Sequence, residues 1–346
     1  MWTRGRIFGL VGLLGAGLGA IGSPASAEKV TIGILNGASS WGFLIADERG
    51  YFKDAGIEAS FVIFDSGAKM TPSLSTGEID AGAGSASSGL YNAVRRGITL
   101  KIVADAVRNA PGYGQALLVR KELISQGKVK GIADLKGGTV AITNEAATEA
   151  SSLDQAMKSV GLGYDDVKKV FLPFDQHAVA FQNGGIDASL TGEPNATAAV
   201  KLGVAVRFMG VGDYYPNSQA ALVLYSERFA REKSDLARRF MIAYVKAVRD
   251  YNDGLESGHL AGKNADEIVA ILAKRSNVRD AAVIRAMWAH AIDPDGWVNE
   301  ESINIDWKFF KDRGQINGEV TPDKVLDRSF ADAAVKALGP YKRAGQ

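Results

Sequence analysis

From Glu28 onward, short apolar runs alternate with segments in which apolar residues recur every three or four positions. A short apolar run predicts a strand, and the three-to-four-residue recurrence predicts a helix. The first series predicts strands at 30–35, 57–64, 79–83 and 100–104, and helices at 45–53, 69–76 and 87–96. Regular alternation of strands and helices is typical of α/β folds with mostly parallel sheets.

A second series repeats this plan. It predicts strands at 139–142, 167–172, 186–190 and 204–209, and helices at 148–160, 177–182 and 195–202. Three short motifs also recur in order: FVIFD at 61–65 as FLPFD at 171–175, GEIDA at 77–81 as GGIDA at 184–188, and VRRGI at 94–98 as VKLGV at 200–204. Because the offsets of 110, 107 and 106 residues are nearly constant, the repeat predicts two lobes built on one plan.

The last third of the chain has a different pattern. After a strand candidate at 219–225, helices predominate, and the segment 234–252 carries its large apolar residues on one stripe. We therefore predict an α/β fold with two lobes, each a mostly parallel sheet flanked by helices, and a helical C-terminal extension on lobe I. The expected bounds are 28–112 and 220–346 for lobe I and 113–219 for lobe II, with crossings near 107–116 and 213–222.

The first 27 residues have the pattern of a secretory signal peptide. Arg4 and Arg6 precede an uncharged run at 7–21, and the small residues of 25–27 follow. This arrangement predicts export and cleavage before Glu28. A membrane anchor is the alternative, but the run is shorter than the ~20 residues that a spanning helix needs. No cysteine stands at the cleavage site, so we expect no lipoprotein and, in a bacterium, a periplasmic protein.

Composition excludes several classes of protein. With 40 basic and 39 acidic residues the chain has little net charge, so we expect no nucleic-acid partner. It contains no cysteine, which excludes disulfides, thiol nucleophiles and cysteine-ligated metals. Its three histidines lack metal-ligand spacing, and neither a Gly-x-Ser-x-Gly nor a phosphate-loop motif occurs. We expect a monomer that is not an enzyme and uses no cofactor or metal.

Several motifs carry a resemblance to a known family. They are ADERGYFKDAGI at 46–57, GEIDA at 77–81, DLKG at 134–137, GEP at 192–194 and DGWVN at 295–299. The chain resembles the periplasmic substrate-binding proteins of ABC importers, in the branch with nitrate-, sulfonate-, taurine- and thiamine-pyrimidine-binding members. The resemblance implies a type II-like fold in which two lobes, joined by two hinge strands, close on a small-molecule ligand. It also implies a partner, the importer's transmembrane permease with its cytoplasmic ATPase.

The expected ligand site lies where helices begin beyond the carboxyl ends of strands, because free backbone N–H groups point into the crevice there. Four loops of this kind supply the candidates Asn36, Ser39, Trp41, Ser85, Ser87, Asn144, Glu145, Thr148 and Glu193. Further candidates follow the repeated strands or lie near the expected crossings: Asp65, Lys69, His177, Tyr113, Tyr214 and Tyr215.

For several candidates a structural role is also consistent with the sequence. Trp41 either contacts ligand or packs in the core. Ser85 and Ser87 bind ligand, cap the following helix, or do both. Glu193 either binds a ligand N–H or cation, or complements a helix dipole. The repetition of Asp65 in the second lobe favours a structural role for it.

The identity of the ligand stays open at the level of sequence. The family suggests a sulfonate or nitrate, whereas the aromatic and acidic residues of the loops favour a planar or hydrogen-bond-donating organic solute, such as a pyrimidine or an amide. We expect capture of a small polar organic solute for an importer. The alternative is an enzyme on the same scaffold, either a lyase that uses Glu193 or Glu145 or an enzyme of pyrimidine-precursor synthesis, whose family relative has a cysteine-rich motif that is absent here.

Overall fold

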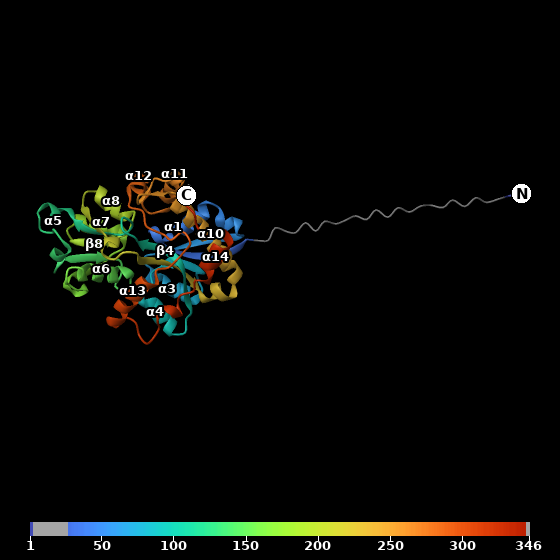
Figure 1. Cartoon of the computed structure of the whole chain (residues 1–346), viewed down its shortest axis with the longest axis horizontal. Coiled ribbons are helices and arrows are strands. Elements are labelled where there is room, and N and C mark those ends of the chain that lie inside the picture. The colour runs from blue at the N-terminus through green and yellow to red at the C-terminus, as the bar shows by residue number, and fades with distance from the viewer. Residues whose placement is uncertain (3–26, 344–346) are drawn as a thin grey trace.

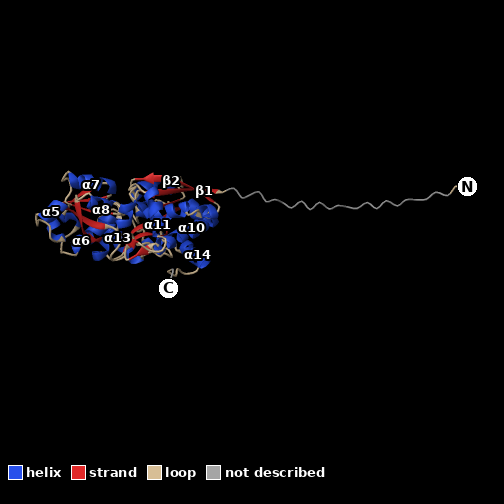
Figure 2. Cartoon of the chain, turned by 90° about the horizontal axis from the view of Figure 1, so that it is seen from above, coloured by secondary structure: helices blue, strands red, loops and turns tan. Residues whose placement is uncertain are grey.

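Two lobes lie side by side in the structure, a computed structural model that describes residues 1–2 and 27–343 (Figure 1). Each lobe contains one five-stranded sheet, and Figure 2 shows helices around the strands of both. This confirms the predicted two-lobed α/β architecture. The expected signal peptide lies almost entirely outside the described residues.

The two sheets have the same plan. Lobe I contains β1 (Glu28–Leu35), β2 (Ile57–Phe64), β3 (Ala81–Gly84), β4 (Leu100–Asn109) and β10 (Ser218–Ser226), in the order β2-β1-β3-β10-β4. Lobe II contains β5 (Ala116–Arg120), β6 (Thr139–Ile142), β7 (Lys168–Phe171), β8 (Ala188–Thr191) and β9 (Ala205–Gly210), in the order β7-β6-β8-β5-β9. The first three strands of each order pair in parallel. The strand that arrives from the other lobe, β10 or β5, is antiparallel to both its neighbours.

The helices alternate with these strands up to β10 and then dominate the chain. They are α1 (Trp41–Glu48), α2 (Tyr51–Asp54), α3 (Gly67–Thr76), α4 (Ser88–Arg95), α5 (Lys121–Ser125), α6 (Thr148–Lys158), α7 (Phe174–Gln182), α8 (Asn195–Lys201), α9 (Val211–Tyr214), α10 (Ser234–Asp253), α11 (Ala265–Arg275), α12 (Ala281–Ala286), α13 (Glu300–Asp312) and α14 (Ser329–Leu338). The short strands β11 (Leu255–Glu256) and β12 (His259–Leu260) pair as a hairpin. The sequence pattern predicted neither β5 nor α5.

The repeated GEIDA and GGIDA motifs have one structural role in both lobes. Gly77 and Gly184 follow α3 and α7 with φ of 70° and 67°, a conformation that favours glycine after a helix. Asp80 Oδ2 accepts a backbone N–H of β1 at 3.0 Å, and Asp187 Oδ2 accepts one of β6 at 2.9 Å. Each aspartate therefore ties its loop to the neighbouring parallel strand, which explains why the motif occurs twice.

The C-terminal tail packs on lobe I and also reaches lobe II. On lobe I, α10 packs against α1 and α2, and the rings of Phe240 and Phe52 stack with centroids 4.9 Å apart. Helix α13, near the junction of the lobes in Figure 1, packs against α6 of lobe II. The Tyr215 hydroxyl donates to Asp306 Oδ1 on α13 at 3.1 Å. The sequence suggested an extension on lobe I. The extension does pack there, but it also contacts lobe II and so bridges both lobes.

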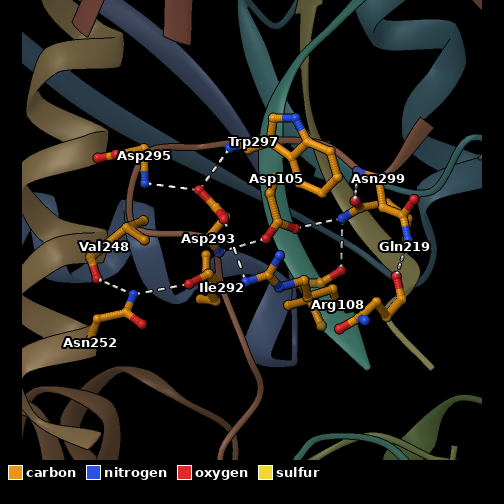
Figure 3. Close-up of polar contacts among 12 residues, drawn as sticks. Asp105, Arg108, Gln219, Val248, Asn252, Ile292, Asp293, Asp295, Trp297 and Asn299 are labelled. Atoms are coloured by element: carbon orange, nitrogen blue, oxygen red, sulfur yellow. Dashed lines mark hydrogen bonds and ion pairs between the residues drawn. The ribbon is translucent and has the colours of Figure 1, made fainter. Parts of the chain in front are cut away.

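Two crossings join the lobes, at 110–115 between β4 and β5 and at 211–217 between β9 and β10. They touch each other, because a Cβ added to Gly212 would lie 2.5 Å from the carbonyl carbon and oxygen of Ala110. Next to them, Asp105 on β4 accepts a hydrogen bond from Gln219 Nε2 on β10 at 2.5 Å. Figure 3 shows this buried network with the loop that contains Asp293. The connection between the lobes is therefore a packed and hydrogen-bonded structure.

Candidate ligand-binding site

A cavity of about 220 Å³ lies between the lobes. Its wall is built from six loops that follow β1, β2 and β3 in lobe I and β6, β7 and β8 in lobe II. These are the carboxyl ends of parallel strands, where the α/β fold leaves helix N-termini and loop side chains free to meet a ligand. The volume is below the ~300–1,000 Å³ of pockets that hold drug-sized molecules, so the cavity suits a small metabolite.

Five of the predicted site residues line this cavity: Asn36, Ser39, Asp65, Ser85 and Glu193. The first four come from lobe I and the last from lobe II. Asp65 is exposed at the rim, where its Oδ2 lies 2.5 Å from Lys69 Nζ. The structure therefore brings all four predicted loops to the cavity, but the loop after β6 lines it through Thr143 and Ala147 rather than through its predicted candidates.

Three other candidates have structural roles. Trp41 is fully buried in the core of lobe I, with its ring centroid 5.8 Å from that of Tyr251. Ser87 caps α4, since its side chain accepts the Leu90 N–H at 3.2 Å. Thr148 Oγ1 donates to the carbonyl of Ala220 at 3.1 Å, a contact from α6 to β10. None of the three lines the cavity.

The candidate His177 belongs to α7, where it is buried rather than exposed in the cavity. Its Nε2 lies 3.0 Å from the Leu172 carbonyl oxygen, so this nitrogen carries the proton and donates. Its Nδ1 then accepts from the Thr191 hydroxyl at 2.8 Å. Burial lowers the pKa of His177 to about 4, which keeps the ring neutral in the folded protein.

The remaining candidates also lie outside the cavity wall. Asn144 Oδ1 accepts the N–H of Ala146 at 2.8 Å and shapes its own loop, and Glu145 is exposed. Tyr113 packs against the core of lobe I. The side chains of both tyrosines at 214–215 belong to the apolar packing near α13.

Glu193 is held by several contacts at the back of the cavity. Its carboxylate accepts from the Thr197 N–H at 2.9 Å and from Arg207 Nη1 at 3.2 Å. Burial raises the pKa of this carboxyl, and the Thr197 and Arg207 contacts oppose that rise. Its backbone N–H donates to His290 Nε2 at 3.1 Å, which links lobe II to the C-terminal tail. Glu193 thus lines the cavity and also orders the start of α8.

Sequence reasoning missed several residues of the wall. Glu149 in the first turn of α6 lines it, as do Gln115, Phe64, Phe174 and His290. An acidic residue in a first helical turn ordinarily complements the helix dipole, so Glu149 gave no separate signal. Its half-buried position beside Thr143 and Gln115 raises its pKa by burial. His290 lies far along the chain from the other loops, and only the fold brings it to the cavity.

We expect the buried His290 to make the protein less stable in acid. Burial, with Arg207 nearby, lowers the pKa of His290 from 6.5 to about 3. At a pH below the pKa of 6.5 that His290 has in the unfolded chain, the unfolded chain binds a proton there and the folded chain does not. The free energy of unfolding therefore falls, as pH decreases, by up to about 1.4 kcal/mol per pH unit. In a His290→Gln variant, whose amide oxygen can still accept the Glu193 N–H, this loss should be shallower. Urea unfolding between about pH 6.5 and pH 4 measures it, and identical slopes would contradict the prediction.

Within residues 27–343, no helix is long and apolar enough to span a membrane. In the same part of the chain, no three His, Asp or Glu side chains are grouped so that they could hold a metal ion.

Comparison with known proteins agrees with this geometry. The fold is that of the two-lobed periplasmic binding proteins: the alkanesulfonate-binding protein of Xanthomonas axonopodis pv. citri bound to MOPS superposes with a TM-score of 0.70 at 18% identity, over 88% of this chain and 100% of that one. The nitrate-binding protein of Synechocystis PCC 6803 gives 0.72 at 15% identity, over 90% and 89%. The family model described as NMT1/THI5 like matches residues 38–253. The chain belongs to this family.

Two curated relatives match this chain over only part of their own length. A putative aliphatic sulfonates-binding protein of Escherichia coli (strain K12) is 29% identical over 197 residues, which span 56% of this chain but only 58% of that protein. One of Bacillus subtilis (strain 168), with the same description, is 29% identical over 238 residues, 66% of this chain and 67% of that protein.

Proposed function

We propose that this protein is an extracytoplasmic solute-binding protein, which captures a small polar organic solute between its lobes and delivers it to the permease of an ABC importer. The observation that carries the proposal is the cavity wall, to which both lobes contribute the same three kinds of strand-to-helix loop. Family membership and the descriptions of the relatives support the same reading. In this proposal the site binds the solute and does not convert it.

Closure of the lobes is the step that a ligand would drive. A ligand shifts an open–closed equilibrium only by the difference between its affinities for the two states. A solute that touches loops of both lobes has such a difference, because only the closed form offers both sets of contacts. The crossings at 110–115 and 211–217 are the segments about which the lobes would rotate.

The location and assembly of the protein follow the same proposal. The mature chain would begin at Glu28 and work, untethered and as a monomer, in the periplasm, with lobe I formed by 28–112 and 220–346 and lobe II by 113–219. Its macromolecular partner would be the importer permease with its cytoplasmic ATPase. The five predicted residues that line the cavity (Asn36, Ser39, Asp65, Ser85 and Glu193) remain the proposed ligand contacts from the sequence.

A solute panel tests the proposed function. We expect at least one solute to raise Tm without being converted, because a ligand present at ~100 times its Kd adds about 2.7 kcal/mol to the free energy of unfolding. Differential scanning fluorimetry of residues 28–346 across amines, amides, heterocycles, sulfonates and inorganic anions measures the shift, and mass spectrometry of the mixture checks for turnover. Conversion of a panel member would instead support the enzyme.

A further inference from the structure

The cavity wall is acidic. Four carboxyl side chains line it: Asp65 and Glu193 come from loops, and Glu149 and Asp175 from the first turns of α6 and α7. No lysine or arginine of the described residues lines it. Two of the four form ion pairs, Asp65 with Lys69 and Glu193 with Arg207. Among residues 27–343, Glu149 and Asp175 form no ion pair, so the wall presents carboxyl groups that a cation or an N–H donor can contact.

Glu149 is the acid best placed to select a ligand. It stands in the first turn of α6, half-buried in the wall. The side chains that interact with it, Thr143 and Gln115, are neutral. The buried carboxyl of Asp306 on α13 interacts repulsively with it. A carboxylate in such surroundings gains from a cation or from N–H donors and loses from any further anion.

The aromatic residues of the wall point to the shape of the ligand. Phe64 and Phe174 hold equivalent places in the repeated motifs, and each is followed directly by an aspartate of the wall. Each lobe therefore brings one Phe-Asp pair to the cavity. Ring faces attract flat groups and cations, so a planar group that enters the cavity would meet a ring and a carboxylate from each lobe.

We propose that the cavity takes an organic nitrogen compound that is neutral or positively charged, that donates N–H groups to Glu149, and that carries a planar group which contacts Phe64 and Phe174. Sulfonates and nitrate would be excluded by the same wall. This ligand class rests on the proposed function, and it differs from the ligands in the descriptions of the relatives.

Three probes of one shape test the charge preference. Benzamidine, benzamide and benzenesulfonate share a ring and differ in charge. We expect benzamidine to raise Tm most, benzamide less, and benzenesulfonate not at all, with Kd from calorimetry in the same order. A rise in Tm with benzenesulfonate that equals or exceeds the rise with benzamidine would overturn the ligand class but leave the binding function intact. If neither these probes nor any member of the solute panel binds, the proposed function fails as well.

A matched pair of variants assigns the preference to one residue. Glu149→Gln should weaken benzamidine binding by about tenfold to a hundredfold, because a charge-assisted hydrogen bond is lost. Benzamide should lose less, and benzenesulfonate should bind better than to the unmodified protein. The control is Glu122→Gln, which also changes a first-turn glutamate, on the exposed helix α5, and should alter neither affinity. Equal losses for benzamidine and benzamide, at unchanged Tm without ligand, would show that the Glu149 charge does not select the ligand.

Discussion

Replacing Asp105 by alanine should lower the free energy of unfolding by about 3–5 kcal/mol, the usual cost of removing one partner from a buried charged network. Asp105 is fully buried on β4. Its Oδ1 accepts from Gln219 Nε2 at 2.5 Å, and its Oδ2 accepts the Asp293 N–H at 2.7 Å. Alanine would leave the Asp293 N–H without this acceptor, and Gln219 Nε2 would keep only the carbonyls of Val107 and Ala221. Arg108, visible in Figure 3, would keep its ion pair with Asp293.

Urea unfolding of the full mature chain measures this loss. The control is Asp332→Ala, which removes an exposed carboxylate from α14 and should change stability by less than about 0.5 kcal/mol. A loss for Asp105→Ala no larger than that of the control would contradict the network's role in holding β4, β10 and the 293 loop together.

The Asp105→Asn variant adds a pH test of the same group. Burial raises the pKa of Asp105 from 3.8 to about 7. Between these values the unfolded chain releases a proton that the folded chain keeps, so the stability contributed by Asp105 falls as pH rises, by up to about 1.4 kcal/mol per pH unit. The asparagine variant lacks this term, and its stability deficit relative to the unmodified protein should shrink from about pH 4 to about pH 7.

The second large effect is expected at the contact between the crossings. A Gly212→Ala variant would place its Cβ 2.5 Å from the backbone carbon and oxygen of Ala110. Backbone atoms cannot rotate away as the end of a side chain can, so the two crossings must separate. We expect a loss of about 1–3 kcal/mol in stability and a weaker affinity for any solute that binds both lobes, because the relative position of the lobes changes.

Thermal unfolding and calorimetry with the best solute of the panel measure both effects. Gly131→Ala is the matched control, since a Cβ there meets nothing within 4 Å and its φ is −151°. If Gly212→Ala and Gly131→Ala behave alike, the crossings are free to separate without consequence, and the contact does not position the lobes.

The strands were predictable because each one is a short apolar run that can be recognised from neighbouring residues alone. Both β2 and β6 match the expected ranges of 57–64 and 139–142, as apolar runs between turn residues. The strand β5 was not predicted, because its residues 116–120 run directly into α5 at Lys121 without a glycine or proline to separate them. The repeat was visible because its glycines and aspartates serve the same loops in both lobes.

The site was predictable only as loops, because the direction of each side chain depends on distant partners. Thr148 and Glu149 are neighbours in one helical turn, yet Thr148 bonds to β10 while Glu149 lines the cavity. Trp41 follows the first site loop but turns into the core toward Tyr251 on α10. His290 reaches the wall only because the tail folds back over lobe I, and no local pattern encodes that contact.

The topology of the two sheets also implies an order in which the protein can be completed. All five strands of the second sheet lie between residues 116 and 210, so that sheet can form from one uninterrupted stretch of chain. During synthesis of the chain, the first sheet lacks β10 until residue 226 has left the ribosome, and α10 and α14 are synthesised later still. Because contacts between distant segments form slowly and domains fold as units, we expect the lobe in the middle of the chain to finish first, and the lobe that holds the N-terminal strand to wait for the tail.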